Sequence, residues 1–263
     1  MRTITIALGQ FLPDGDPERN AATICRMLRD AAMQGAELML FPECSLTGYS
    51  VENAAALALE GTSAPVRAVE AQCRAETVTA CFGYIERTES GLAITQELFD
   101  GAQATLYRKT HLGSREQAVF RAGDVFPVAE KPLKTGMQLC WESHIPEISA
   151  LERGRGAELL LVPYASAMHG EQCRRHWMVH LPARASDNGL FLAACNLPFP
   201  ARNGVPGGGG MAVFDPKGAC AASYFGAEEH TLLCTLSGPL PRELPPGDMH
   251  AISYFDRKRT ELF

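Results

Sequence analysis

The sequence predicts an α/β protein built as a four-layer α-β-β-α sandwich. The first half of the chain alternates strand-like and helix-like segments and ends in two strands that read as hairpin neighbours. A segment at Gly35–Glu43 (GAELMLFPE) also returns as GAELLLVPY at Gly156–Tyr164. Two such half-units, each with a sheet and covering helices, can pack sheet against sheet about an internal pseudo-two-fold axis.

The elements of the first half follow from the spacing of apolar residues. Thr3–Leu8 is apolar and β-branched, which predicts a strand. Glu18–Gln34 places apolar residues at helical spacing, and Gly35 ends that helix. Further predicted elements are a strand at Glu37–Phe41, a helix at Ala64–Glu76 and strands at Val78–Ile85, Leu92–Phe99 and Ala102–Tyr107.

In the second half, Met137–Leu139 predicts a strand, Pro146–Arg155 a helix and Met211–Phe214 a late strand. The alternative interpretation of the repeated segment is that no duplication occurred, because the order helix, glycine, apolar strand and proline is common in α/β proteins. The four glycines at Gly207–Gly210 precede no Lys-Ser or Lys-Thr pair. They therefore indicate a tight turn or a close approach of backbones.

We expect one main domain at residues 1–238 and a C-terminal tail at residues 239–263. The tail contains four prolines and several charges. It is expected to pack on the domain or at the interface with a neighbouring subunit.

Composition narrows the class of protein. Of 263 residues, 46% are hydrophobic and 21% charged, as in ordinary globular proteins, and the net charge of −6 offers no basic footprint for nucleic acid or anionic membrane. The nine cysteines contain no C-x-x-C pair, which favours reduced, buried thiols over disulfides or zinc. No apolar stretch approaches the ~20 residues needed to span a bilayer. These patterns predict a cytoplasmic protein that acts on a small molecule.

Three polar residues follow predicted strands. Cys140 closes an apolar run before a predicted helix, where backbone N–H groups favour a thiolate and can hold an oxyanion. Taken alone, such a cysteine is more often inert packing. Glu43 lies where α/β active sites gather, at the rim of a sheet, although a solvated charge is the plain alternative. Lys109, in isolation, is typical of a surface charge.

Together these residues form three motifs in order along the chain: F-P-E at 41–43, Y-R-K-T-H-L at 107–112 and L-C-W-E at 139–142. The motifs resemble the nitrilase, or carbon–nitrogen hydrolase, superfamily, and more closely its short amidase-like branch. The resemblance extends over nearly the whole chain. Further matching positions are Leu46–Tyr49, Glu116, Phe120, Gly123, Pro146-Glu147, Pro182–Asn188 and Asn196.

The resemblance implies an enzyme with the four-layer sandwich fold, without a cofactor. It also implies dimers formed through helices near the cysteine and through the C-terminal tail. Carried over residue by residue, Glu43 is the general base, Lys109 the oxyanion stabiliser and Cys140 the nucleophile. Glu116 matches a second glutamate that helps to hold the site.

The chemistry of this trio agrees with those roles. A free thiol is only a few per cent ionised at neutral pH, so Glu43 is needed to accept the proton of Cys140. Lys109 and the backbone N–H of Trp141 would stabilise the oxyanion, and one such donor is worth roughly 3–4 kcal/mol of barrier. Protonated Glu43 can then give its proton to the departing amine. The resulting carboxylate can activate a water molecule, without a metal or organic cofactor.

Other residues carry weaker predictions. Tyr49, His144 and Tyr164 are candidate substrate-binding residues. The alternative for the two tyrosines is packing in the hydrophobic core, and the alternative for His144 is a position in solvent or at an interface. His111 is expected to make a structural hydrogen bond. His169, His176 and His180 share no metal-binding spacing with nearby carboxylates.

The substrate is open on this sequence. Trp141-Glu142 after the cysteine is similar to true nitrilases, whereas the lysine loop resembles the short amidases. We expect hydrolysis of a small amide, with nitrile hydrolysis and N-carbamoyl or acyl-transfer chemistry as alternatives. The Gly209-Gly210-Met211 segment has glycine where a serine is frequent in the family, which puts any role for that hydroxyl in doubt. Asp187 stands where glutamate is usual, which is a modest change. A non-catalytic scaffolding subunit is the alternative of another class, opposed by the cost of keeping a buried charge pair beside a thiol.

Overall fold

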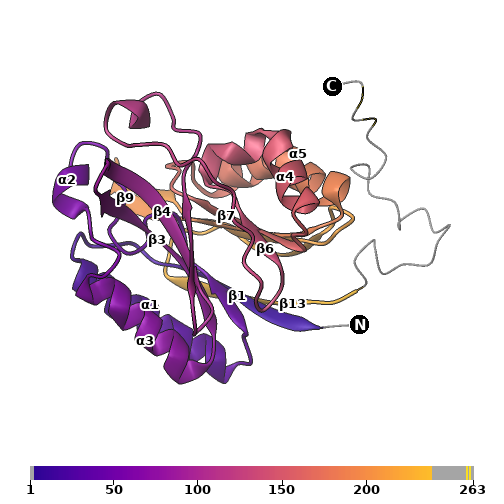
Figure 1. The fold of residues 1–263 in the computed structure, drawn as a ribbon, viewed down its shortest axis with the longest axis horizontal. Coiled ribbons are helices and arrows are strands. Elements are labelled where there is room, and N and C mark those ends of the chain that lie inside the picture. Colours follow the sequence, from indigo (N-terminus) through magenta and orange to yellow (C-terminus); the bar gives the residue numbers. More distant parts are fainter. Residues whose placement is uncertain (1–2, 239–258, 260, 262–263) are drawn as a thin grey trace.

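The computed structural model describes residues 3–238, 259 and 261, and contains two sheets that pack face to face (Figure 1). One sheet has six strands in the order β13-β1-β2-β3-β4-β5, and the other has five in the order β12-β11-β8-β7-β6. A separate ribbon pairs β9 (Pro198–Arg202) with β10 (Val205–Gly208). The predicted tail at 239–263 lies outside the described residues except for Arg259 and Glu261, so its packing stays a prediction.

The first half builds the six-stranded sheet, which only β13 joins from the second half. Its strands are β1 (Ile4–Gln10), β2 (Leu38–Leu40), β3 (Thr79–Thr88), β4 (Gly91–Phe99) and β5 (Ala104–Arg108), and its helices are α1 (Pro17–Met33), α2 (Ala54–Leu57) and α3 (Ala64–Glu76). Asp16 caps α1 by accepting from the backbone N–H groups of Glu18 and Arg19 at 3.0 and 3.3 Å. The bounds predicted for α3 are confirmed, whereas α2 is a helix that the sequence did not predict.

The second half builds the five-stranded sheet. Its strands are β6 (Thr135–Met137), β7 (Leu159–Tyr164), β8 (Phe191–Asn196), β11 (Met211–Phe214) and β12 (Cys220–Tyr224), its helices are α4 (Pro146–Gly154) and α5 (Gly170–Asn188), and β13 (His230–Leu236) returns to pair with β1. Two short 3₁₀ helices, η1 (Glu116–Ala118) and η2 (Cys140–His144), precede α4. Strand β6 ends at Met137, before the predicted end at Leu139.

Four layers result, and they confirm the predicted fold. Helices α1 and α3 cover the outer face of one sheet and α4 and α5 that of the other (Figure 1). One buried core lies between the sheets. In it, the sulfur of Cys81 from β3 lies 3.9 Å from the sulfur of Met137 from β6. Parallel strands buried on both faces read as unbroken apolar runs, which explains LML at 38–40 and LLL at 159–161.

The repeated segments occupy equivalent places in the two sheets. Strand β2 lies between β1 and β3, and β7 lies between β6 and β8, with all four pairings parallel. This arrangement supports two similar halves. The prediction for the four glycines is also confirmed, because a Cβ on Gly208 or Gly209 would lie only 2.0 or 2.2 Å from a backbone oxygen. No helix within the described residues is long and apolar enough to cross a membrane.

Candidate active site

Lys109 is the centre of a buried ion cluster at the carboxyl ends of two strands of the six-stranded sheet, β2 and β5. Its Nζ lies 2.9 Å from Oε1 of Glu43 and 2.8 Å from Oε1 of Glu116. The three side chains are only 2%, 1% and 7% exposed. Glu43 follows β2 after two residues, and Lys109 follows β5 directly. The structure therefore brings three of the predicted catalytic residues into direct contact.

Glu116 is held on a loop that leaves and returns at Lys109. The loop closes through a 2.9 Å hydrogen bond from the Gly123 N–H to the Lys109 carbonyl. Besides Lys109, the Glu116 carboxylate accepts the Gly113 N–H at 2.6 Å and the Tyr49 hydroxyl at 2.9 Å. Three donors thus hold this carboxylate in place, and one of them, Tyr49, connects the ion cluster to its surroundings.

Glu43 has one oxygen free for chemistry. Its Oε1 contacts Lys109, while Oε2 is buried without a hydrogen-bond partner among the described residues. Burial raises the pKa of Glu43 to about 7, against the opposing charge of Lys109, and the Glu116 charge adds to the rise. A carboxylate with a pKa near neutrality is suited to both accepting and returning a proton.

Cys140 begins η2 with a positive φ of 54°, in the left-handed region that a side chain rarely adopts. Burial and the Glu43 charge raise the pKa of the thiol to about 12, while Lys109 and a backbone hydrogen bond from Ala165 act in the other direction. The resting cysteine is therefore a thiol. This corrects the prediction that the N–H groups after the strand favour a thiolate, because desolvation outweighs them, and attack requires a base.

Glu142 connects the nucleophile turn to the lysine loop, a role that the sequence did not predict. Its fully buried carboxylate accepts from the Leu139 N–H and the Tyr107 hydroxyl, each at 2.7 Å. The other oxygen accepts from the N–H and hydroxyl of Thr110 and from the His111 N–H. Its place in the L-C-W-E motif was the available signal, but only the fold shows what it reaches.

His111 and Trp141 complete this connection. The Trp141 indole N–H donates to the His111 carbonyl at 2.7 Å, and the His111 ring nitrogen Nδ1 lies 2.8 Å from the Thr110 hydroxyl. The predicted structural hydrogen bond of His111 is confirmed. Trp141 is 40% exposed, so its ring covers the outside of the turn.

Two of the predicted substrate-binding residues lie on the α5 side of the nucleophile turn. Tyr164 is 2% exposed, packs on Trp177 and places its hydroxyl 2.6 Å from Oγ of Ser143. His144 stacks on His180 with 4.0 Å between ring centroids. Within the described residues no group of three or more His, Cys, Asp or Glu side chains is arranged to hold a metal ion.

A cleft of about 870 Å³ opens beside the ion cluster. Tyr49 joins the two, since it lines the cleft and donates to Glu116. Ala165 also lines it and hydrogen-bonds Cys140. The remaining lining residues are mostly apolar: Val51, Ala167, Phe199, Pro200, Val205, Pro206 and Gly207, with Ser50, Glu52, Arg115 and His169.

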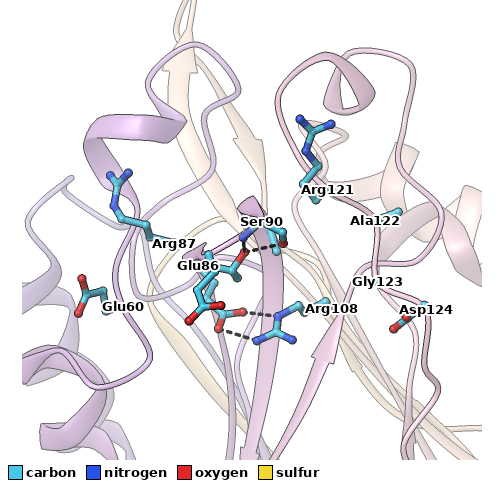
Figure 2. Close-up of a pocket in the computed structure, with 12 residues that line it drawn as sticks. Glu60, Glu86, Arg87, Ser90, Arg108, Arg121, Ala122, Gly123 and Asp124 are labelled. Carbon is cyan, nitrogen blue, oxygen red and sulfur yellow. Dashed lines mark hydrogen bonds and ion pairs between the residues drawn. The ribbon is translucent and has the colours of Figure 1, made fainter.

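A second groove, of about 830 Å³, lies at the base of the lysine loop (Figure 2). Figure 2 shows the Glu86 carboxylate facing the Arg108 guanidinium, with contacts of 2.6 and 2.8 Å, and Arg121 and Asp124 across the groove. Its lining contains none of the predicted site residues. The first cleft, by contrast, is lined by Tyr49, whose hydroxyl reaches the ion cluster at Glu116.

Comparison with known proteins agrees with this geometry. The carbon–nitrogen hydrolase family model matches residues 5–239. Omega-amidase NIT2 of Xenopus tropicalis is 29% identical over 220 residues, which cover 77% of this chain and 76% of that protein. A hydrolase in the pqqF 5′ region of Pseudomonas protegens is 32% identical over 206 residues, or 74% and 70% of the two chains.

Solved structures of an amidase have the same fold. A cysteine mutant of the amidase from Nesterenkonia sp. AN1 in complex with butyramide superposes with a TM-score of 0.82 at 28% identity, over 98% of this chain and 95% of that one. Another structure of that amidase carries the acetamide moiety of fluoroacetamide on its active-site cysteine, at 27% identity and the same coverage. This chain therefore belongs to the carbon–nitrogen hydrolase family, in the nitrilase superfamily, and is an amidase-like enzyme.

Proposed function

We propose that this enzyme hydrolyses the C–N bond of a small amide through a thioester on Cys140. The products are a carboxylic acid and ammonia or an amine. One observation carries the proposal: Lys109 is held between Glu43 and Glu116 in a buried cluster whose one unpartnered carboxylate oxygen belongs to Glu43. Burying three charged groups costs folding free energy, which supports a catalytic use of the cluster.

Acylation begins with attack of the Cys140 sulfur on the amide carbon. Because the thiol is not ionised at rest, Glu43 accepts its proton as the C–S bond forms. Negative charge then moves to the amide oxygen. Lys109 and the backbone N–H of Trp141 stabilise that oxyanion, and Glu116 keeps the ammonium group in position.

Collapse of the tetrahedral intermediate breaks the C–N bond. Protonated Glu43 gives its proton to the departing nitrogen, which leaves the acyl group as a thioester on Cys140. Glu43 then takes a proton from a water molecule that attacks the thioester carbon. The C–S bond breaks, the acid leaves, and the thiol recovers its proton from Glu43.

The cleft favours a short, uncharged acyl group. Its lining is mostly apolar, and its two charged side chains, Arg115 and Glu52, form an ion pair with each other. The related Nesterenkonia amidase was solved with butyramide. A second candidate is an amide at the far end of an acid, because several relatives are omega-amidases and Arg115 is a cation at the cleft. In both cases Tyr49 contacts the substrate.

The deciding experiment measures ammonia released from a matched panel of butyramide, succinamic acid, butyronitrile and an N-carbamoyl amino acid. We expect butyramide to be the best substrate and the Cys140→Ala variant to retain under about 1% of the turnover. Preference for succinamic acid would select the omega-amide candidate. Preference for the nitrile or the carbamoyl compound would select one of those alternatives instead.

Acid quenching during turnover, followed by peptide mass spectrometry, tests the intermediate. An acyl adduct on Cys140 is expected. An adduct on another cysteine would overturn the site assignment. If no compound is turned over and Cys140 reacts with electrophiles no faster than the other cysteines, the scaffolding alternative replaces the enzyme proposal.

Cytoplasmic location and homodimer formation also belong to this proposal. The first rests on the cysteine pattern and the second on the family resemblance. Sedimentation analysis of the full chain tests the dimer.

A further inference from the structure

A buried polar cluster lies where the nucleophile turn η2 meets β7 and α5. Its centre is Oγ of Ser143, which donates to the Cys140 carbonyl at 2.8 Å. The same oxygen lies 2.6 Å from the Tyr164 hydroxyl and 3.0 Å from Nε2 of His180. The Ser143 residue is fully buried, and Tyr164 and His180 are 2% and 6% exposed.

The hydrogen atoms of this cluster follow from its contacts. Nδ1 of His180 lies 3.1 Å from the His176 carbonyl, which can only accept, so Nδ1 carries a proton. Burial lowers the pKa of His180 to about 4, which keeps the ring neutral and leaves Nε2 as an acceptor. Because the Cys140 carbonyl can only accept, the single hydroxyl proton of Ser143 is directed to it. The Tyr164 hydroxyl then donates toward the Ser143 oxygen and toward Nε2 of His180, which lie 2.6 and 3.3 Å away.

The bond to the Cys140 carbonyl orients a whole peptide unit. That carbonyl and the Trp141 N–H belong to one planar trans peptide, so they point in opposite directions and turn together. Cys140 is held at φ 54°, where the backbone is strained and would relax without support. Arg184 holds the other end of the turn through a 2.9 Å hydrogen bond to the Ser143 carbonyl.

We infer that Ser143, fixed by Tyr164 and His180, is a positioning residue that aims the Trp141 N–H at the oxyanion. The inference rests on the proposed function, because it concerns the oxyanion formed when an amide is attacked. It assigns Tyr164 to the support of the turn, in place of the substrate contact predicted from sequence. None of the three side chains is among those that line the cleft.

The test compares Ser143→Ala with Ser149→Ala. Ser149 is a matched control, since it is equally buried and its hydroxyl contacts Gln138 instead of Cys140. Complete loss of one oxyanion donor lowers kcat by about 10²–10³-fold, so misaiming it in Ser143→Ala should lower kcat roughly 10- to 100-fold with KM within about twofold. We expect kcat for Ser149→Ala within about twofold of wild type.

Tyr164→Phe provides a second variant in case Ser143→Ala folds poorly. It removes the donor to Ser143 but keeps the bond to the Cys140 carbonyl, so a decrease in kcat of only a few fold is expected. Ser143→Thr retains the hydroxyl and should recover most of the kcat lost in Ser143→Ala. If Ser143 had a purely structural role, the decrease in kcat would not follow this order among the three variants.

Reaction with methyl methanethiosulfonate separates aiming of the peptide from damage to the nucleophile. The Cys140 thiolate attacks the reagent's sulfur and expels methanesulfinate, so no carbonyl oxyanion forms. The rate at Cys140, measured by peptide mass spectrometry, should be within about twofold of wild type in Ser143→Ala.

Two results would overturn the inference. One is an undiminished kcat in Ser143→Ala, and the other is an equal decrease in turnover and in thiol modification. If wild type reacts with the thiosulfonate but hydrolyses no amide, the proposed function fails first, and the two failures are thereby distinguished.

Discussion

Replacement of Glu116 by glutamine tests whether the Lys109 cluster is functional. The change keeps the shape of the side chain but removes its charge. Three donors converge on this carboxylate, from Lys109, Tyr49 and the Gly113 backbone. Glutamine has one acceptor oxygen and two N–H donors, so it cannot receive all three.

The structure sets the magnitude of the effect. Removing one partner of a buried ion pair costs 3–5 kcal/mol, and we expect the lower end, about 3 kcal/mol of unfolding free energy, because Lys109 keeps Glu43. The displaced ammonium group also stabilises the oxyanion less well. Since one donor is worth about 10²–10³-fold in kcat, we expect a decrease of roughly 100-fold.

Glu86→Gln is the matched control. The Glu86 carboxylate also accepts three hydrogen bonds, two from Arg108 and one from the Thr95 hydroxyl, but it lies in the groove of Figure 2. Urea unfolding should show destabilisation of both variants, whereas ammonia release should fall steeply only in Glu116→Gln. A Glu116→Gln enzyme that keeps more than half of the wild-type kcat would refute the reasoning.

Three further predictions follow from the charges. The kcat/KM for an amide should rise with pH through an apparent pKa of about 7, because protonated Glu43 cannot accept the thiol proton; a flat pH–rate profile from pH 5 to 9 would contradict this base. At high pH we expect kcat/KM to stay constant up to about pH 10, because Glu43, Cys140 and Glu116 raise the pKa of Lys109 despite its burial. Measuring kcat/KM up to pH 10.5 tests this expectation, and a decrease that begins below pH 10 would contradict it. Away from the site, burial raises the pKa of Glu97 from 4.5 to about 7. Protonated Glu97 therefore contributes to the free energy of unfolding below pH 4.5, and this contribution, about 3 kcal/mol, is lost as pH rises through 7. Urea unfolding at pH 5 and pH 8 should show a smaller pH dependence for Glu97→Gln than for wild type, and equal dependences would exclude this assignment.

Much of the fold was predictable because local patterns and tertiary structure agree. The apolar spacing in Ala64–Glu76 predicted that helix with its observed bounds. The repeated apolar segments predicted two similar half-units, and they form the strands β2 and β7 of the two sheets. The short helix α2 was missed because four residues carry too little periodicity. Strand β6 ended early because the chain must turn to bring Cys140 to the site.

The candidate site was predictable only in part. Glu43, Lys109, Glu116 and Cys140 came from motif order, and the structure places the first three in contact. The role of Glu142 could not be predicted, since its partners lie about 30 residues away in the lysine loop. The pKa of Cys140 was predicted in the wrong direction, because burial at the end of the strand is a property of the packed sheets.

By itself the sequence determined the residue types, their order and the α/β pattern, because these depend on neighbours along the chain. Tertiary structure decided which carboxylate oxygen is left unpartnered, which side of the turn Tyr164 supports, and that Cys140 rests as a thiol. These properties depend on desolvation and on contacts between residues tens of positions apart. Both are fixed only when the two sheets pack together.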